Sequence, residues 1–167
     1  MTMTMTPEKL NTGLGLKGHL TVTRGDGSIM FEGKNMIVNA GLEAIIDALV
    51  SAGNINTFKY IGFGTGNVNT AATDAALGAE VSGGTYARLS ATQAEGDTAR
   101  QYRLTGTWTN TSGASRVVTE YGIFSATSTG IMLARICDNE DAQVLTKTVA
   151  VNETIAVTWN IDLSDVA

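Results

Sequence analysis

The chain has 167 residues, of which 43% are apolar, so it is long enough and apolar enough to bury a core of its own as one domain. It carries 11 Lys and Arg against 16 Asp and Glu, and this net charge of −5 excludes a general attraction to nucleic acid or to an anionic membrane. Cys137 and His19 are the sole residues of their types, which excludes an internal disulfide and a zinc site built from several such side chains.

The first part of the chain, residues 1–16, is predicted to be a flexible N-terminal arm that precedes a single domain over residues 17–167. The arm begins with alternating Met and Thr, and it lacks the basic region and apolar block of a signal peptide. No apolar run is long enough to cross a bilayer, so we expect a protein made in a cytoplasm. Two interpretations of the arm stay open: a disordered terminus, or a segment that becomes ordered against a neighbouring subunit.

A β-hairpin is predicted next. Residues 19–23 alternate between polar and apolar, Gly25-Asp26-Gly27 has the composition of a turn, and residues 28–32 form the returning strand. The tripeptide Arg24-Gly25-Asp26 also occurs in cell-adhesion ligands. Because it falls where the hairpin needs turn residues, we interpret it as part of the turn and not as an adhesion site.

One helix follows the hairpin. Asn39 is placed to cap its start, and Gly53 is a natural stop. Between them, four large aliphatic residues recur with the spacing of one helical face: Leu42, Ile45, Ile46 and Leu49. We expect this face to pack against the rest of the protein.

A strand beginning at Phe58 runs into a glycine-rich loop with the spacing Gly62-x-Gly64-x-Gly66, which resembles a nucleotide-binding motif. That motif needs a helix directly after the glycines, but residues 67–74 have the composition of a loop, and the Lys-Ser/Thr pair of a phosphate-binding loop is missing. We therefore reject nucleotide binding. The glycines are interpreted as a tight turn where backbone approaches backbone, and Gly62 and Gly64 are expected to be required for folding.

The remainder of the chain consists of predicted strands separated by polar turns. These strands cover residues 86–90, 102–109, 117–124, 131–137, 144–151 and 154–163. The strand at 131–137 is apolar on both faces, so we place it in the centre of a sheet. Regularly spaced strands after one helix predict a mainly β fold, namely an antiparallel, jelly-roll-like β-sandwich with one short α-helix that caps an open end.

No recognisable catalytic, cofactor-binding or metal-binding pattern is present, and we predict that the protein is not an enzyme. His19 falls in a predicted edge hairpin. Cys137 ends an apolar strand, where a buried and unreactive thiol is expected. The run Asp138-Asn139-Glu140-Asp141 could hold calcium, but it lacks the glycine and the spaced ligands of an EF-hand loop, so we interpret it as a solvated loop.

Three features occur in a fixed order over residues 17–163. The first is the helix that opens with Asn39-Ala40-Gly41-Leu42. The second is Tyr60-Ile61-Gly62-Phe63-Gly64-Thr65-Gly66, followed by Leu77, Glu80 and Arg88. The third is Val118-Thr119-Glu120-Tyr121-Gly122-Ile123-Phe124, then Met132-Leu133-Ala134-Arg135, Leu145-Thr146-Lys147 and Val157-Thr158-Trp159-Asn160-Ile161. In this order the chain resembles a family of small structural proteins of tailed bacteriophages, which includes capsid cement (head decoration) proteins and tail or fibre proteins.

The resemblance implies a β-rich module that binds other virion subunits and has no catalytic site. Because the chain ends at Ala167, just after its last predicted strand, it has no room for a fibre shaft or a receptor-binding tip. We therefore expect a cement protein on the capsid exterior, made in the host bacterial cytoplasm. Its expected partners are the major capsid protein and further copies of itself, as a trimer or dimer, without nucleic acid, membrane or cofactor.

Two alternatives stay open. A tail, baseplate or fibre-anchoring module would use the same kind of fold. A small-molecule or carbohydrate-binding sandwich could use Trp108, Trp159 and the tyrosines, but both tryptophans lie on alternating apolar faces and are predicted to be core residues.

Overall fold

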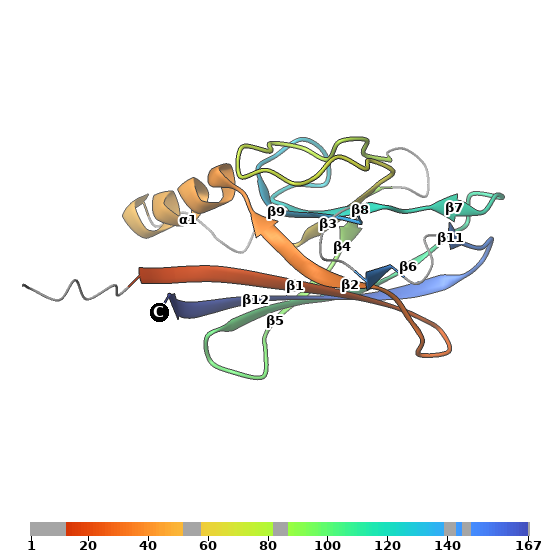
Figure 1. The fold of residues 1–167 in the computed structure, drawn as a ribbon, viewed down its shortest axis with the longest axis horizontal. Helices are drawn as coiled ribbons and strands as arrows, with labels where there is room; N and C mark the ends of the chain where they lie inside the picture. The colour runs from red at the N-terminus through yellow and green to blue at the C-terminus, as the bar shows by residue number, and fades with distance from the viewer. Residues whose placement is uncertain (1–12, 52–57, 82–86, 139–142, 145–147, 167) are drawn as a thin grey trace, which may run out of the picture.

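The computed structural model describes residues 13–51, 58–81, 87–138, 143–144 and 148–166. Within these ranges the protein is an antiparallel β-sandwich, nearly closed into a barrel, with one short helix (Figure 1). The predicted fold class is therefore confirmed. Residues 1–12, which hold most of the predicted arm, lie outside the described residues.

The elements follow one another with a single helix near the start of the described chain. In order they are β1 (Gly13–Arg24), β2 (Ile29–Ile37), α1 (Asn39–Ser51), β3 (Tyr60–Gly64), β4 (Leu89–Ser90), β5 (Thr92–Glu95), β6 (Gln101–Thr109), β7 (Arg116–Val117), β8 (Glu120–Phe124), β9 (Met132–Cys137), β10 (Gln143–Val144), β11 (Thr148–Val149) and β12 (Thr154–Val166).

The strands form two layers that share β2. Their order is β4-β3-β8-β9-β2-β1-β12-β6-β5. We call β2, β1, β12, β6 and β5 the long sheet, and β4, β3, β8 and β9 the short sheet. Strand β2 joins the two layers, because its residues up to Asn35 pair with β1 whereas Met36 and Ile37 pair with β9. Figure 1 shows β2 crossing from the lower to the upper layer.

The core fills the space between the two layers. On β12 the residues Ile155, Val157, Trp159 and Ile161 are buried, as the alternating pattern predicted. Trp108 and Trp159 are both core residues, which confirms their prediction. Leu163 was predicted to continue this face, but 37% of it is exposed, because the long sheet extends beyond the short sheet at this end.

Several predicted strands differ from the observed ones. The stretch predicted at residues 117–124 is divided into β7 and β8. Of the stretch predicted at 144–151, Val144 ends β10 and residues 148–149 form β11, while residues 145–147 lie outside the described residues. Strand β5 was missed because its sequence, Thr-Gln-Ala-Glu, carries no alternating apolar signal. Strand β1 is not at a sheet edge as predicted for His19, since it pairs with both β2 and β12. It also includes residues 13–16, which the sequence analysis assigned to the arm.

The central strands β8 and β9 are buried on both faces, as predicted for residues 131–137. Their inner face packs into the main core. Their outer face is covered by residues 65–80, which we call the outer loop and which carries Leu77 onto Phe124 and Met132. Figure 1 shows this loop lying over the short sheet.

Helix α1 approaches the short sheet unusually closely at Gly41. A Cβ atom at this position would lie 2.6 Å from the carbonyl oxygen and 2.7 Å from the Cα atom of Leu133. Backbone atoms cannot rotate away as a side chain can. The glycine therefore fixes how near the start of the helix lies to β9.

We predict that Gly41→Ala lowers the free energy of unfolding by about 1–3 kcal/mol, because the added methyl group is overpacked against the backbone of β9. Helix propensity alone predicts the opposite sign, a gain of about 1 kcal/mol. Urea unfolding decides between the two. Gly25→Ala is the matched control, since nothing lies within 4 Å of a Cβ atom there. A Gly41→Ala protein more stable than the parent would contradict the close contact.

Candidate functional site

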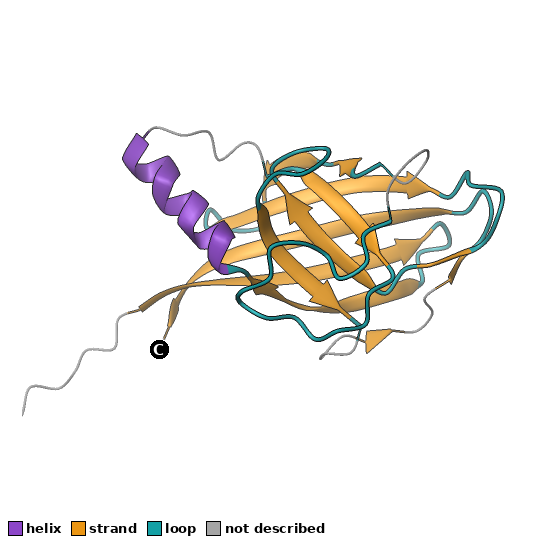
Figure 2. Cartoon of the chain, turned by 90° about the horizontal axis from the view of Figure 1, so that it is seen from above, coloured by secondary structure: helices purple, strands orange, loops and turns teal. Residues whose placement is uncertain are grey.

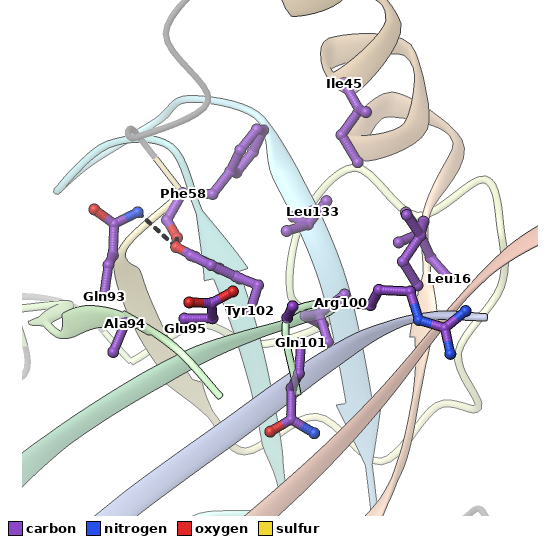
Figure 3. Close-up of a pocket in the computed structure, with 13 residues that line it drawn as sticks. Leu16, Ile45, Phe58, Gln93, Ala94, Glu95, Arg100, Gln101, Tyr102 and Leu133 are labelled. Atoms are coloured by element: carbon purple, nitrogen blue, oxygen red, sulfur yellow. Dashed lines mark hydrogen bonds between the residues drawn. The ribbon is translucent and has the colours of Figure 1, made fainter. Parts of the chain in front are cut away.

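An apolar groove lies at the end of the molecule that carries α1. Here β1 and β12 remain paired as far as Gly13 opposite Val166, whereas β2 has already left the long sheet after Asn35. The groove has a volume of ≈ 620 Å³. Figure 3 shows side chains from both layers and from α1 that line it, among them Leu16, Ile45, Phe58, Tyr102 and Leu133.

The hydroxyl of Tyr102 is one of the polar groups that line the groove, together with the side chains of Gln93, Glu95, Arg100 and Gln101. It donates a hydrogen bond of 2.6 Å to the carbonyl oxygen of Phe58 and accepts one of 2.6 Å from Nε2 of Gln93. Burial raises the pKa of Tyr102 above its usual value. The hydroxyl is therefore neutral, and its hydrogen bond holds the backbone of Phe58 in place. The apolar part of the lining comes from Leu16, Ile45, Phe58, Leu133, Ile161 and Leu163.

Beside the groove, α1 is tied to the rest of the protein at its start. The amide of Val38 donates to the carbonyl of Leu133 at 3.1 Å, and the amide of Asn39 donates to the carbonyl of Ala72 in the outer loop at 2.7 Å. Further along, Ala44 and Ile45 pack against the core. These contacts fix the direction in which the helix projects from the sandwich, as Figure 2 shows.

The helix presents a stripe of large aliphatic side chains to solvent, which corrects the prediction that all four residues of its apolar face pack inward. Ile45 does pack inward. Leu42, Ile46 and Leu49 are 42%, 58% and 73% exposed, and we call these three residues the apolar stripe. Their spacing of four and then three residues places them in one line along the helix. The sequence predicts an apolar face, but the contact at Gly41 turns most of that face outward.

The position of the helix depends on the outer loop, and the outer loop is held by a buried carboxylate. Glu120 on β8 is 0% exposed. Its oxygens accept hydrogen bonds from the backbone amides of Gly66 at 3.0 Å, Gly78 at 2.9 Å and Ala79 at 2.7 Å. Converging backbone amides of this kind make an anion-binding concavity. The two ends of the outer loop thus form an anion cradle whose anion is supplied by the chain itself.

The cradle explains the glycines and corrects their interpretation as a turn where backbone meets backbone. A Cβ atom at Gly64 or at Gly66 would lie 2.4 Å from Oε1 of Glu120. At Gly62 a Cβ atom would lie 2.8 Å from the ring of Phe124. What approaches the glycine backbone is therefore a pair of buried side chains from β8.

Arg135 on β9 supplies a positive charge opposite the buried carboxylate of Glu120. It donates from Nε and Nη2 to Oε2 of Glu120, at 3.0 and 2.7 Å, and from Nη1 to Asp74 in the outer loop at 2.7 Å. Burial by itself lowers the pKa of Arg135, but its hydrogen bonds to Asp74 and Glu120 raise it above the usual value. Removing one partner of a buried pair typically costs about 3–5 kcal/mol, because the other charge is left uncompensated.

A second clamp holds the far end of the outer loop. Arg88 makes a two-pronged contact with Glu80, at 2.6 and 2.9 Å, and donates to the carbonyls of Ala126 and Thr129. Its guanidinium carbon lies 3.4 Å from the centre of the Phe124 ring. The stacking and the bidentate geometry are characteristic of arginine, so this contact fixes the loop in both position and orientation.

The residues that the sequence singled out for possible reactivity are not brought together. His19 lies 3.7 Å from Glu32 on the surface of the long sheet, and Cys137 is buried as expected. The Arg24-Gly25-Asp26 segment forms the predicted turn, and Arg24 is bonded to Glu153 and to the carbonyl of Thr148. Residues 139–141 of the acidic run lie outside the described residues. Among those described, no group of three or more His, Cys, Asp and Glu could hold a metal ion.

Sequence reasoning missed the Glu120–Arg135 pair, although a signal for it exists. Each residue is a charge within a strongly apolar predicted strand, and the two charges are opposite. Buried charges are paired as a rule. Two such strands that are neighbours in the chain therefore predict an ion pair between β8 and β9.

No protein-family model matches this chain, and a search of curated proteins gives no match either. The described part of the chain contains no helix with the length and apolar character needed to cross a bilayer. The family expected from the sequence therefore stays a prediction.

We predict that Gly64→Val prevents folding into the native structure. Even its Cβ atom would lie 2.4 Å from Oε1 and 2.6 Å from Cγ of Glu120, and this side chain cannot move without breaking the cradle. Circular dichroism and the soluble yield after expression measure the effect. Gly25→Val, at a site with open space, is expected to fold. Soluble Gly64→Val protein with native spectra and native stability would show that the cradle is not required.

Proposed function

We propose that this chain is a structural protein of a tailed-bacteriophage virion, and that it acts as a capsid cement protein that bridges subunits of the major capsid protein on the outside of the head. The observation that carries the proposal is the apolar stripe, a line of aliphatic side chains held toward solvent on a firmly anchored helix. The resemblance of residues 17–163 to phage structural proteins gives the class of partner.

The apolar stripe has the character of a protein-binding surface. Its three side chains retain 42–73% of their exposure, and full burial of such a side chain is worth about 1.5–3 kcal/mol. Covering the remaining exposed surface of all three would therefore contribute about 3 kcal/mol. Contiguous exposed apolar surface on a soluble domain marks interaction sites more often than isolated apolar residues do.

Two further exposed apolar side chains, Val117 and Val151, belong to the region of β7 and β11, and Figure 1 shows these strands at the end of the sandwich opposite α1. Val117 is 48% exposed and lines a cavity of ≈ 290 Å³ together with Phe63 and Trp108. Val151, in the turn after β11, is 41% exposed. A module with apolar surface at both ends can contact two subunits at once, which suits a bridging role.

A protein that bridges two subunits can stay bound to the shell even when each of its two contacts is weak. A shell presents many equivalent subunits, so the second contact of a bridging protein forms at a high effective concentration once the first has formed. This gain depends on a fixed separation between the two surfaces. The buried cradle and the Arg88 clamp supply such a fixed geometry, because they tie the outer loop and α1 to the short sheet.

We predict that replacing the apolar stripe weakens binding to capsids about 100-fold, which corresponds to the roughly 3 kcal/mol of burial that is lost. The variant combines Leu42→Gln, Ile46→Gln and Leu49→Gln, since glutamine keeps helix propensity while removing the apolar surface. Binding to purified phage heads that lack the protein is measured by co-sedimentation. The matched control is Val68→Gln on the outer loop, where the side chain is 67% exposed.

The control is expected to bind like the parent protein. Failure of the parent protein to bind such heads would contradict the proposed function. The number of copies per intact virion, measured by quantitative gel staining, separates the capsid role from a tail role. Hundreds of copies are expected for cement, and a handful would assign the protein to the tail.

A further inference from the structure

The long sheet has a second broad face, which points away from the core. Side chains alternate along a strand, so the residues between the buried ones all lie on this second face. In Figure 1 the short sheet, α1 and the outer loop lie above the long sheet, and its lower side carries none of these elements. We call this side the threonine face and define it by its threonines: Thr21 and Thr23 on β1, Thr154 and Thr158 on β12, Thr105, Thr107 and Thr109 on β6, and Thr92 on β5.

The strand register aligns these threonines in rows that run across the sheet. None of their side chains is buried. Neighbouring positions in a row are about 4.8 Å apart, and successive rows are about 6.8 Å apart. The result is a flat array of short side chains. The rows join Thr21 with Thr158, Thr105 and Thr92, then Thr23 with Ala156 and Thr107, and then Thr109 with Thr154.

The rows of the threonine face carry no charge among the strands β1, β12, β6 and β5. Strand propensity favours threonine, but it does not keep charged side chains away from a face that water covers. The charges lie in the row next to Thr21, which holds Lys34, His19 and Arg103, and at the β2 edge, where Glu32 lies. An uncharged centre within a charged border is the composition of a protein interface. Threonine also loses little rotamer freedom on burial, because branching at Cβ already restricts it.

The size of the threonine face suits a second copy of this chain. Five strands from β2 to β5 span about 24 Å, and the seven residues from Asn160 back to Thr154 span about 24 Å along the strands. Each copy would therefore contribute about 600 Å² in projection. Two copies reach about 1,200 Å², the lower limit of stable specific interfaces. Sheets stack face to face at about 10 Å, and small side chains on both surfaces permit this spacing.

The two ends of the threonine face carry opposite charges. Lys34 and His19 are paired neighbours at the end toward α1, and Asp26 lies in the exposed turn between β1 and β2 at the other end (Figure 1). A two-fold axis that crosses the strands between the rows of Thr21 and Thr23 would bring the basic end of each copy against Asp26 of the other. Two-fold pairs are the commonest oligomers, and this one opposes unlike charges.

We propose that two copies of this chain associate through their threonine faces about this two-fold axis, with their long sheets stacked face to face. The association leaves α1 and the end with β7 and β11 uncovered, so the pair presents the apolar stripe of both copies. This inference goes beyond the virion role and does not depend on it, because the association is a property of the purified chain.

Sedimentation equilibrium of the full-length protein, from about 1 to about 300 µM, is the test. A reversible monomer–dimer equilibrium with a micromolar dissociation constant is expected for an interface of this size. Thr158→Lys is expected to raise that constant at least about tenfold, because it buries an unpaired charge in the stacked sheets. The matched control is Thr73→Lys, at an exposed position on the outer loop, and it should dimerise like the parent protein.

Circular dichroism shows whether each variant is folded, and Thr107→Lys on the neighbouring strand replaces Thr158→Lys if the latter does not fold. A parent protein that stays monomeric at the highest concentration would overturn the proposal. Equal dimerisation by the folded face variant and the Thr73→Lys control would overturn it as well.

Carbodiimide cross-linking tests the orientation of the two copies. The reagent joins a lysine amine to a carboxylate that touches it, and mass spectrometry is expected to find an amide bond between Lys34 and Asp26. Within one chain these residues are about 24 Å apart, since Lys34 lies opposite His19, seven residues from Asp26. The bond must therefore join two copies. Dimers whose cross-links all lie elsewhere, for example through α1, would contradict the proposed pairing.

Discussion

The structure depends on one buried carboxylate. Glu120 projects from the outer face of the short sheet and is bound by three backbone amides of the outer loop and by Arg135. A carboxylate is costly to bury unless it is paired and hydrogen-bonded, and here it has both kinds of partner. Its side chain occupies the space beside Gly64 and Gly66 that a Cβ atom would need, so the glycines serve the architecture of the protein.

This interaction determines what the surface presents. Because Glu120 holds the outer loop on β8 and β9, the carbonyl of Ala72 is in position to accept the first amide of α1. The helix start is then pressed against β9 at Gly41, which turns Leu42, Ile46 and Leu49 outward. The groove arises at the same end, where the long sheet passes beyond the short one. A chain of hydrogen bonds and close contacts thus connects the cradle to the surface proposed to bind other subunits.

Much of this architecture can be predicted from local patterns. Period-two alternation places β1, β6 and β12, and the apolar character of residues 131–137 places β9 at the centre of a sheet. The direction of α1 cannot be predicted in this way, because an apolar helical face does not specify which of its residues meet the core. That choice depends on the long-range contact between Gly41 and Leu133. The partner of the glycine-rich loop is equally remote, since Glu120 lies 54 positions along the chain from Gly66.

Amide hydrogen exchange at Gly66, Gly78 and Ala79 tests the central claim most directly. If Glu120 makes the outer loop part of the cooperative core, these three amides exchange only through global unfolding, with the same opening free energy as the amides of β8 and β9. They should therefore be among the slowest in the protein, although they lie in a loop. Exchange of these amides at the rates of exposed loop amides, while β8 and β9 stay protected, would contradict the account.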